Sequence, residues 1–299
     1  MRVALGQFKS RAIGSFDEFA DHVRWHIDGA RWQEADIIVF PEYFTSELLT
    51  ALPEAKGVKS GDFSPVMERY ASEFTEAYRS MLREFARESN IHIVAGSHFY
   101  LDESDGKYYN SSLFVDPSGR IEEQRKTHRA YELVYNRAAM TPGDDLRVFD
   151  TPWCRMGITI CYDSAFPEVA RVLALQGAEL LMLPSCVFNE YGVTRLNAYA
   201  TSRAIENQCF VANSQLAGEL TVPEDKPIVY RGQSAIHTPA DPAFGARDGI
   251  AVQTTADLEQ VVSADLDRGA LRDYRKNAVP NMLPDRRPEL YGPLVEAIK

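Results

Sequence analysis

Three side chains that are capable of chemistry follow three separate strand-like segments of the sequence. Glu42 ends the apolar run IIVFPE, Lys126 ends EEQRK, and Cys161 ends GITIC. A thiol becomes an effective nucleophile when a base takes its proton or when a nearby cation stabilises its anion. A carboxylate and an ammonium group supply these two effects. The three residues are therefore a candidate set for nucleophilic catalysis, provided that the fold brings them together.

Each of the three residues also has a simpler interpretation when it is taken alone. Glu42 is then a solvated carboxylate at a strand end, Lys126 an exposed surface lysine and Cys161 a buried, inert thiol. His128, two residues after Lys126, raises the alternative of a Cys–His couple like that of thiol proteases. No later histidine block with its own Asn or Asp follows Cys161, so we favour the Glu–Lys–Cys interpretation.

The segments that must position these residues have the alternating pattern of an α/β protein. Short runs rich in β-branched residues alternate with stretches of helical period, which indicates layers of helices on sheets. Ser15 with Glu18 predicts a capping box at the start of the first helix. A single long helix is expected from Pro65 to about Ser89, and residues 108–126 predict a β-hairpin with an Asp-Pro-Ser-Gly turn. Ligands bind beyond the carboxyl ends of strands in such sheets, where the three reactive residues lie.

Composition and charge limit the class of protein and its partners. With 299 residues, of which 45% are hydrophobic and 25% charged, and no linker-like tract, residues 1–299 are expected to form a single domain. A net charge of -11 without a long Lys/Arg run argues against a nucleic-acid partner. No apolar stretch approaches the roughly 20 residues of a membrane span. The N-terminal pattern is not that of a signal peptide and the four cysteines form no CxxC pair, so a cytoplasmic location is expected.

Three longer blocks of sequence surround the reactive residues and carry a family resemblance. FPEYF, RKTHRAYE and GITICYDSAFPEVARVLALQGAELLMLPS resemble the signature blocks of the carbon–nitrogen hydrolase (nitrilase) superfamily, whose catalytic set is Glu, Lys and Cys in that chain order. The resemblance extends over nearly the whole chain. It implies an α/β fold in the form of a four-layer α-β-β-α sandwich, a homodimer or higher homo-oligomer, and catalysis without a cofactor.

The resemblance also implies a role for each reactive residue. Glu42 would act as the general base, Cys161 would form a thioester, and Lys126 would hold the oxyanion together with the backbone N–H of Tyr162. A second glutamate follows the lysine in the superfamily, and Glu132 matches its position in one branch. Glu132 is therefore expected to support Lys126; the alternatives are Glu123 in that role or a solvent-facing Glu132.

Further residues near the expected site are candidates for substrate binding. Cys186 follows another strand and either lines the pocket or packs in the core. Asn189 and Arg195 lie in the segment NEYGVTRLNAYATSRAIENQ, to which the resemblance assigns substrate recognition and dimer contacts. Arg195 is a candidate to bind a substrate carboxylate, although pairing at the surface or in an interface is the favoured interpretation.

The residues after Cys161 favour one reaction within the superfamily. Tyr162 and Asp163 resemble the amidase and carbamoylase branches, whereas nitrile-cleaving members carry Trp-Glu at this place. We therefore expect hydrolysis of a small, linear carboxamide with release of ammonia or an amine. The alternatives are hydrolysis of an N-carbamoyl amino acid or ureido compound, acyl transfer, and a non-catalytic, enzyme-derived binding protein.

The histidines give little indication of a metal site. His22 and His26 share one face of a predicted helix, but their motif contains no acidic third ligand. The sequence therefore predicts a partly exposed histidine pair and no bound metal.

Overall fold

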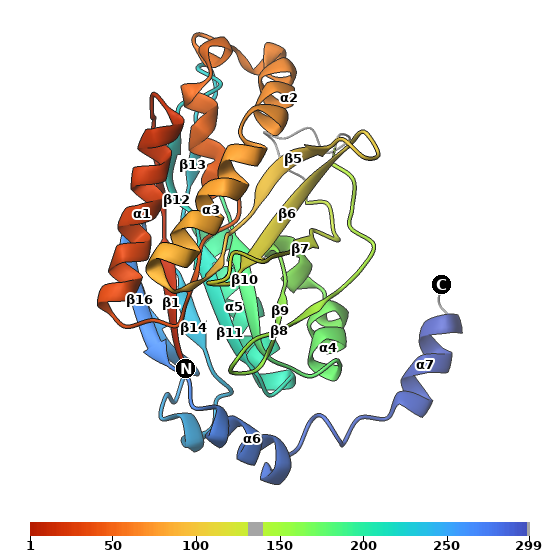
Figure 1. Ribbon diagram of the computed structural model, residues 1–299. Coiled ribbons are helices and arrows are strands. Elements are labelled where there is room, and N and C mark those ends of the chain that lie inside the picture. Colours follow the sequence, from red (N-terminus) through yellow and green to blue (C-terminus); the bar gives the residue numbers. More distant parts are fainter. Residues whose placement is uncertain (131–139, 298–299) are drawn as a thin grey trace.

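Two large β-sheets form the centre of the computed structural model, which describes residues 1–130 and 140–297 (Figure 1). The first sheet has seven strands: β1 (Arg2–Gln7), β3 (Ile37–Val39), β4 (His92–Val94), β5 (His98–Asp102), β6 (Lys107–Val115), β7 (Ile121–Arg125) and β16 (Gln260–Asp265). The second has six: β8 (Val148–Asp150), β9 (Arg155–Ile158), β10 (Ala178–Ser185), β11 (Phe210–Gln215), β14 (Ala235–His237) and β15 (Ile250–Gln253). A small third sheet contains β2 (Lys9–Ser10), β12 (Ala217–Leu220) and β13 (Ile228–Tyr230).

The strand orders place parallel strands in the middle of both large sheets. The first sheet has the order β16-β1-β3-β4-β6-β5, with β7 also paired to β6, and β1, β3 and β4 run parallel. The second has the order β15-β14-β11-β10-β9-β8, and β9, β10 and β11 run parallel. Parallel strands require covering layers on both faces.

Helices supply these covering layers. The helices are α1 (Phe16–Trp32), α2 (Ser64–Glu73), α3 (Thr75–Ser89), α4 (Pro167–Leu175), α5 (Glu190–Glu206), α6 (Arg268–Asn277) and α7 (Pro288–Ala297), with 3-10 helices η1 (Phe44–Ala51), η2 (Pro53–Ala55), η3 (Ser60–Asp62), η4 (Cys161–Ala165) and η5 (Pro242–Phe244). α1 and α3 pack on the first sheet, and α4 and α5 pack on the second (Figure 1). The two sheets face each other through β1 and β11. The predicted four-layer α-β-β-α sandwich is confirmed.

The side chains of β10 show how the sequence specifies these layers. Leu180 and Met182 enter the core between the two sheets, whereas Leu181 and Leu183 enter the core beneath α4 and α5. Successive strand residues point to opposite faces, so a strand that is covered on both sides has apolar residues at every position. Each such side chain contributes roughly 1.5–3 kcal/mol on burial.

The predicted cap of α1 is present in modified form. The Ser15 hydroxyl accepts a hydrogen bond from the Glu18 N–H at 3.2 Å, and the Glu18 carboxylate accepts one from the Gly14 N–H at 3.0 Å. In a capping box this second bond would come from the N–H of Ser15 itself. The helix therefore begins where the sequence predicts, and the carboxylate caps the residue before it.

The prediction of one long helix from Pro65 to Ser89 is wrong. The helix is interrupted at Phe74, which separates α2 from α3. The Thr75 hydroxyl donates to the Ala71 carbonyl at 3.1 Å and also contacts His98 Nε2 at 3.1 Å. A hydroxyl that bonds the carbonyl four residues earlier competes with the backbone ladder and bends the helix.

The hairpin prediction is confirmed, whereas two C-terminal helices were missed. β6 and β7 pair antiparallel across the turn at residues 116–120. Asp267 caps α6 by accepting from the Ala270 N–H at 3.0 Å, but Leu271 is the buried residue of this polar helix, so its apolar period is weak. α7 lies away from the sheets in Figure 1.

Within residues 1–130 and 140–297, no helix is long and apolar enough to cross a membrane.

Candidate active site

The structure places Glu42, Lys126 and Cys161 together. The Lys126 Nζ donates to Glu42 Oε1 at 2.6 Å, and the Cys161 thiol lies close to the Glu42 carboxylate, whose charge raises the pKa of the thiol. Glu42 and Lys126 are fully buried, and Cys161 is 7% exposed. They follow β3, β7 and β9, so each large sheet contributes part of this catalytic cluster. The arrangement combines a buried carboxylate–ammonium pair with a thiol.

The backbone after β3 turns sharply to aim Glu42. Tyr43 adopts the left-handed conformation, with φ of 57°, and its N–H donates to Ser97 Oγ at 3.1 Å. Gly96 allows the chain after β4 to pass close to this turn, because a Cβ at Gly96 would lie 2.0 Å from the Pro41 carbonyl oxygen. A larger residue at position 96 would therefore displace the segment that carries Glu42.

Asn110 holds Lys126 and Glu42 together, and sequence reasoning did not identify it. Its carbonyl accepts from the Lys126 N–H at 2.8 Å, and its side-chain amide donates to Glu42 Oε1 at 3.0 Å. The Lys126 carbonyl in turn accepts from the Gly143 N–H at 2.8 Å. A buried asparagine within the strand β6 was the available signal, because a buried amide requires partners.

Cys161 lies at the start of η4 in a strained conformation. Its φ is 49°, a left-handed value that costs a non-glycine residue about 1–2 kcal/mol. The Ser164 hydroxyl donates to the Cys161 carbonyl at 2.6 Å, and the thiol contacts the Cys186 carbonyl oxygen at 3.5 Å. Strained residues of this kind concentrate at functional sites.

Asp163 joins the segment around Cys161 to the segment after Lys126. Its carboxylate accepts from the backbone N–H of His128 at 2.8 Å, from the hydroxyl of Thr127 at 2.8 Å and from its backbone N–H at 3.3 Å. It also accepts from the Ile160 N–H at 3.3 Å. Sequence reasoning used Asp163 only as a marker of the branch, and these long-range bonds had no local signal.

The Cys–His alternative gains no support from the position of His128. The His128 ring lies 2.9 Å from both Asp163 Oδ1 and the Thr127 hydroxyl, and it stacks on Phe166 with ring centres 3.8 Å apart. No hydrogen bond joins His128 to Cys161 in the part of the chain that the structure describes. Among the described residues, Glu42 and Lys126 are the charged side chains that act on the thiol.

The electrostatic environment keeps Cys161 protonated at rest. Burial raises the pKa of the thiol well above its usual value, and the negative charge of Glu42 raises it further, while the Lys126 ammonium acts in the opposite direction. The sequence suggested that a nearby cation would stabilise the thiol anion, but burial and the carboxylate outweigh the Lys126 ammonium. A thiol in this state needs a base before it can act as a nucleophile, and the carboxylate of Glu42 lies close to it.

The remaining candidate site residues differ in their burial and in their contacts. Glu132 lies outside the described residues. Tyr162 is 42% exposed and packs edge-on against Phe166. Cys186 is buried and presents its backbone carbonyl to the thiol. Asn189 caps α5 by accepting from the Gly192 N–H at 2.9 Å.

Arg195 has no contact that ties it to the catalytic cluster. It lies exposed on α5 and forms no ion pair with any residue whose position is described.

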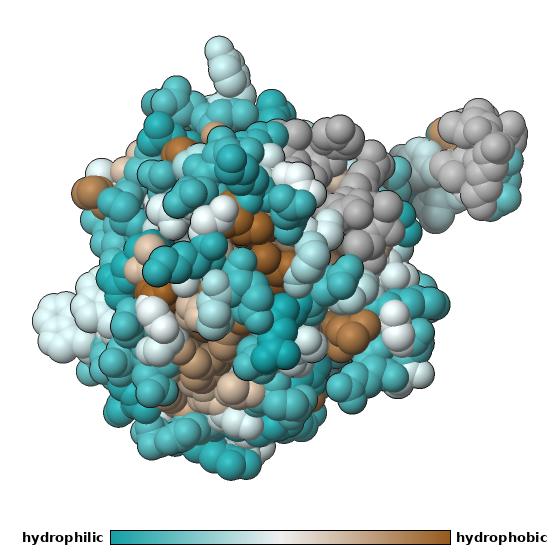
Figure 2. All heavy atoms as spheres, turned by 90° about the horizontal axis from the view of Figure 1, so that it is seen from above, coloured by the Kyte–Doolittle hydropathy of each residue, from teal (hydrophilic) through white to brown (hydrophobic). Residues whose placement is uncertain are grey.

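One face of the molecule, on the side of α2, shows apolar side chains at its centre with hydrophilic ones around them (Figure 2).

The prediction of a partly exposed pair at His22 and His26 is wrong. Both side chains are buried, and carboxylates from distant parts of the sequence approach the rings. Glu47 contacts His22 at 2.9 Å, and Glu259 contacts both histidines. The sequence motif lacked an acidic residue because the fold brings it from the segment before β16.

Comparisons with known proteins identify a family for the chain. The family model described as carbon-nitrogen hydrolase matches residues 2–276. A probable hydrolase, YhcX of Bacillus subtilis, is 37% identical over 294 residues, which is 97% of this chain and 54% of YhcX. The chain thus spans about half the length of that relative. Omega-amidase NIT2-B of Xenopus laevis is 28% identical over 272 residues, covering 89% of this chain and 88% of the relative.

A solved structure has the same fold. An amidase from Nesterenkonia sp. superposes with a TM-score of 0.75 at 22% identity, covering 98% of this chain and 96% of the amidase. At this identity the likeness concerns the fold.

Proposed function

Because the chain belongs to the carbon–nitrogen hydrolase family, we propose that it hydrolyses a linear carboxamide through a thioester on Cys161. The observation that carries this proposal is the position of the Glu42 carboxylate, which accepts a hydrogen bond from the Lys126 ammonium and lies close to the Cys161 thiol. A base, an oxyanion partner and a nucleophile are thereby within reach of one substrate carbonyl.

The first half of the reaction forms the thioester. As Cys161 Sγ attacks the carbonyl carbon, Glu42 accepts the thiol proton and the carbonyl oxygen becomes an oxyanion. Lys126 and the backbone N–H of Tyr162 stabilise this charge. When the intermediate collapses, the carbon–nitrogen bond breaks and Glu42 returns the proton to the leaving nitrogen, which departs as ammonia or an amine.

The second half of the reaction releases the acid. Glu42 removes a proton from water, which attacks the thioester carbonyl, and the same donors stabilise the second oxyanion. The carbon–sulfur bond then breaks, the carboxylic acid leaves, and the thiol regains its proton from Glu42. One carboxylate thus serves as base and acid in alternation. Glu132 is proposed to support Lys126 in both halves.

Amides are preferred to nitriles because of the residues after Cys161 and the names of the relatives. Tyr162 and Asp163 match the amidase-like branch, and relatives are named omega-amidase and amidase. N-carbamoyl hydrolysis and acyl transfer remain the alternatives within the same chemistry. The homodimer and the cytoplasmic location stay predictions.

Ammonia release from a panel of carboxamides and N-carbamoyl amino acids tests the proposal. Cys161→Ala is expected to abolish release while circular dichroism shows an intact fold, whereas the matched control Cys209→Ala, a remote buried cysteine, retains it. Added hydroxylamine would divert the acyl group to a hydroxamate if a thioester forms. Undiminished turnover by Cys161→Ala would refute the mechanism, and product formed only with an added amine would favour transfer.

A further inference from the structure

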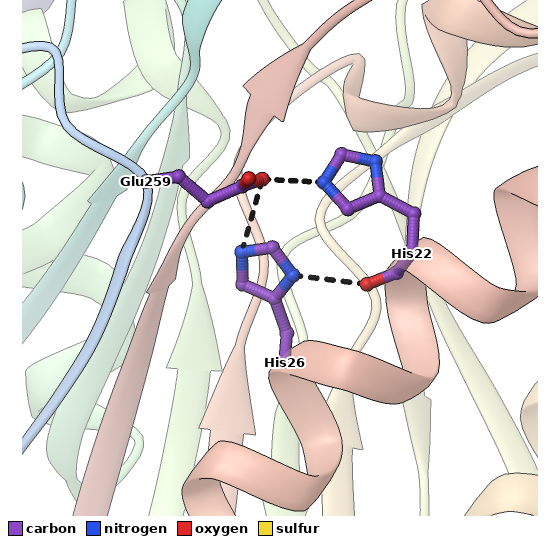
Figure 3. A group of neighbouring side chains, drawn as sticks. All are labelled: His22, His26 and Glu259. Carbon is purple, nitrogen blue, oxygen red and sulfur yellow. Dashed lines mark hydrogen bonds and ion pairs between the residues drawn. The ribbon is translucent and has the colours of Figure 1, made fainter.

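Two histidines and a glutamate form a second cluster outside the catalytic cluster. His22 and His26 lie one turn apart on α1, and Glu259 reaches them from the segment before β16 (Figure 3). One potential ligand atom from each residue lies within 4.8 Å of the other two. We call this group the histidine cluster.

Hydrogen bonds fix the orientation of both imidazole rings. Nδ1 of His22 lies 2.9 Å from Glu47 Oε1, and Nδ1 of His26 lies 3.1 Å from the carbonyl oxygen of His22. Both partners are acceptors, so each Nδ1 carries the proton. The two Nε2 atoms therefore point towards the Glu259 carboxylate, as Figure 3 shows. Metal-binding histidines are typically held in this way, with Nδ1 donating to a carboxylate or a carbonyl.

His26 carries a buried nitrogen that forms no hydrogen bond with any described residue. Its side chain is fully buried, its Nε2 lacks a hydrogen-bond partner within residues 1–130 and 140–297, and the nearest ion-pair partner there is Glu259 Oε1 at 3.8 Å. The backbone of Gln7 is also close, without hydrogen-bond geometry. Because Nδ1 of the neutral ring donates to the His22 carbonyl, Nε2 presents a lone pair. A buried lone pair directed at a carboxylate is unfavourable unless something lies between them.

An ion-pair network explains only part of this arrangement. His22 lies between Glu47 and Glu259, whose hydrogen bonds raise its pKa against the effect of burial. A protonated His22 bridging two carboxylates would account for those three residues. It would not account for the second ring, whose Nε2 faces the same carboxylate.

We propose that His22, His26 and Glu259 bind one divalent transition-metal ion of the Zn²⁺ class. Two imidazole nitrogens and one carboxylate oxygen are a common three-residue ligand set for such ions, with water in the fourth position. The Glu259 side chain is 25% exposed, which gives solvent access to the cluster. Binding would displace the Nε2 proton of His22 into solvent, and no electron transfer is involved.

The surroundings indicate a structural role for the ion. Phe8 packs against both rings, with ring centres 3.9 Å from His22 and 4.9 Å from His26. The ion would connect α1 to the segment before β16, where Glu259 also accepts from the Lys9 N–H at 3.2 Å. Through Glu47 it would also brace η1, which begins two residues after Glu42. The proposal does not depend on the reaction proposed above.

Calorimetric titration of the full chain with Zn²⁺, after chelator treatment and dialysis, tests the site. One ion per chain is expected, with a thermal midpoint that rises with zinc concentration. Buffers of different ionisation enthalpy should show release of about one proton. Glu259→Gln should weaken binding by about 100-fold or more, and Glu179→Gln, a matched half-buried glutamate paired with Arg272, should leave it unchanged.

Two further variants separate this site from the catalytic thiol and from folding defects. Cys161→Ala should bind zinc as the unaltered chain does, and His26→Gln should lose binding even if Glu259→Gln fails to fold. Absence of micromolar binding by the unaltered chain would overturn the proposal. So would binding that survives both Glu259→Gln and His26→Gln, or binding that disappears in Cys161→Ala.

Discussion

The catalytic cluster and the histidine cluster both bury ionisable side chains, but the backbone that carries these side chains differs between the two clusters. Glu42, Lys126 and Cys161 project from the ends of three strands, and left-handed residues redirect the chain at Tyr43 and at Cys161 itself. The histidine cluster instead places two of its members one turn apart on the regular helix α1. Catalytic groups therefore depend on strained turns and on contacts between sheets, whereas the histidines are arranged by helical spacing.

The difference also appears in how each cluster handles its charges. In the catalytic cluster an ammonium group contacts the carboxylate directly, and the neighbouring thiol is kept protonated. In the histidine cluster, Glu259 contacts Nε2 of His22, and Glu47, which lies outside the cluster, contacts Nδ1 of the same ring. The first arrangement holds a proton ready for transfer, and the second holds nitrogen atoms in fixed directions. Substitutions in the two clusters should therefore affect turnover and stability differently.

Among variants that keep the Cys161 thiol, Glu42→Gln should lower turnover most, while it should make the thiol easier to ionise. Loss of the general base is expected to lower kcat about 10²–10⁴-fold. The carboxylate raises the pKa of Cys161, so its neutralisation should lower that pKa and increase the thiolate fraction at any given pH. Alkylation by iodoacetamide, followed across pH by mass spectrometry, should therefore have a lower midpoint in the variant. A midpoint shifted to higher pH would contradict this electrostatic description.

Asp163→Asn should have an intermediate effect, because it weakens the connection between two segments of the catalytic cluster. Asn cannot supply the charged acceptor used by Thr127, His128 and Ile160, so the free energy of unfolding should fall by about 1.5–3 kcal/mol. Turnover should fall with little change in KM, because Lys126 and Cys161 lose alignment. Urea denaturation and steady-state kinetics measure the two effects.

The matched control for Asp163 is Asp150→Asn, at an exposed end of β8. Its ion pair with Arg155 lies at the surface and should change stability by less than about 1 kcal/mol. Equal losses of stability in the two variants would show that Asp163 has no special positioning role.

Glu47→Gln should have the smallest effect on turnover while lowering stability. It removes a buried acceptor of the His22 Nδ1–H, with an expected loss of about 1–3 kcal/mol. The backbone N–H of Arg11 also donates to this carboxylate, at 3.3 Å, and the amide can retain that bond. Ammonia release by the folded variant should stay within a few-fold of that of the unaltered chain. A loss of turnover as large as that of Glu42→Gln would mean that the two clusters are not separable.

Local patterns allowed much of the fold to be predicted. Ser15 was identified as a cap because a hydroxyl three residues before Glu18 satisfies a free N–H in any context. The fully apolar run of β10 indicated a strand covered on both faces. The polar helix α6 was missed because it buries a single leucine, and the interruption at Phe74 was missed because it depends on Thr75 and its contact with His98. The assignment of all 299 residues to one domain stays a prediction.

The sequence by itself determined that a strand precedes each of the three reactive residues, because strand and helix periods and caps are set by neighbours along the chain. It thereby placed Glu42, Lys126 and Cys161 at positions where reactive groups of an α/β fold lie. Only the tertiary structure decided that Asp163 bonds the segment after Lys126, that Glu259 faces His22 and His26, and that Cys161 stays protonated. Burial and Coulomb interactions depend on distances between groups that are far apart in the sequence, and packing alone sets those distances.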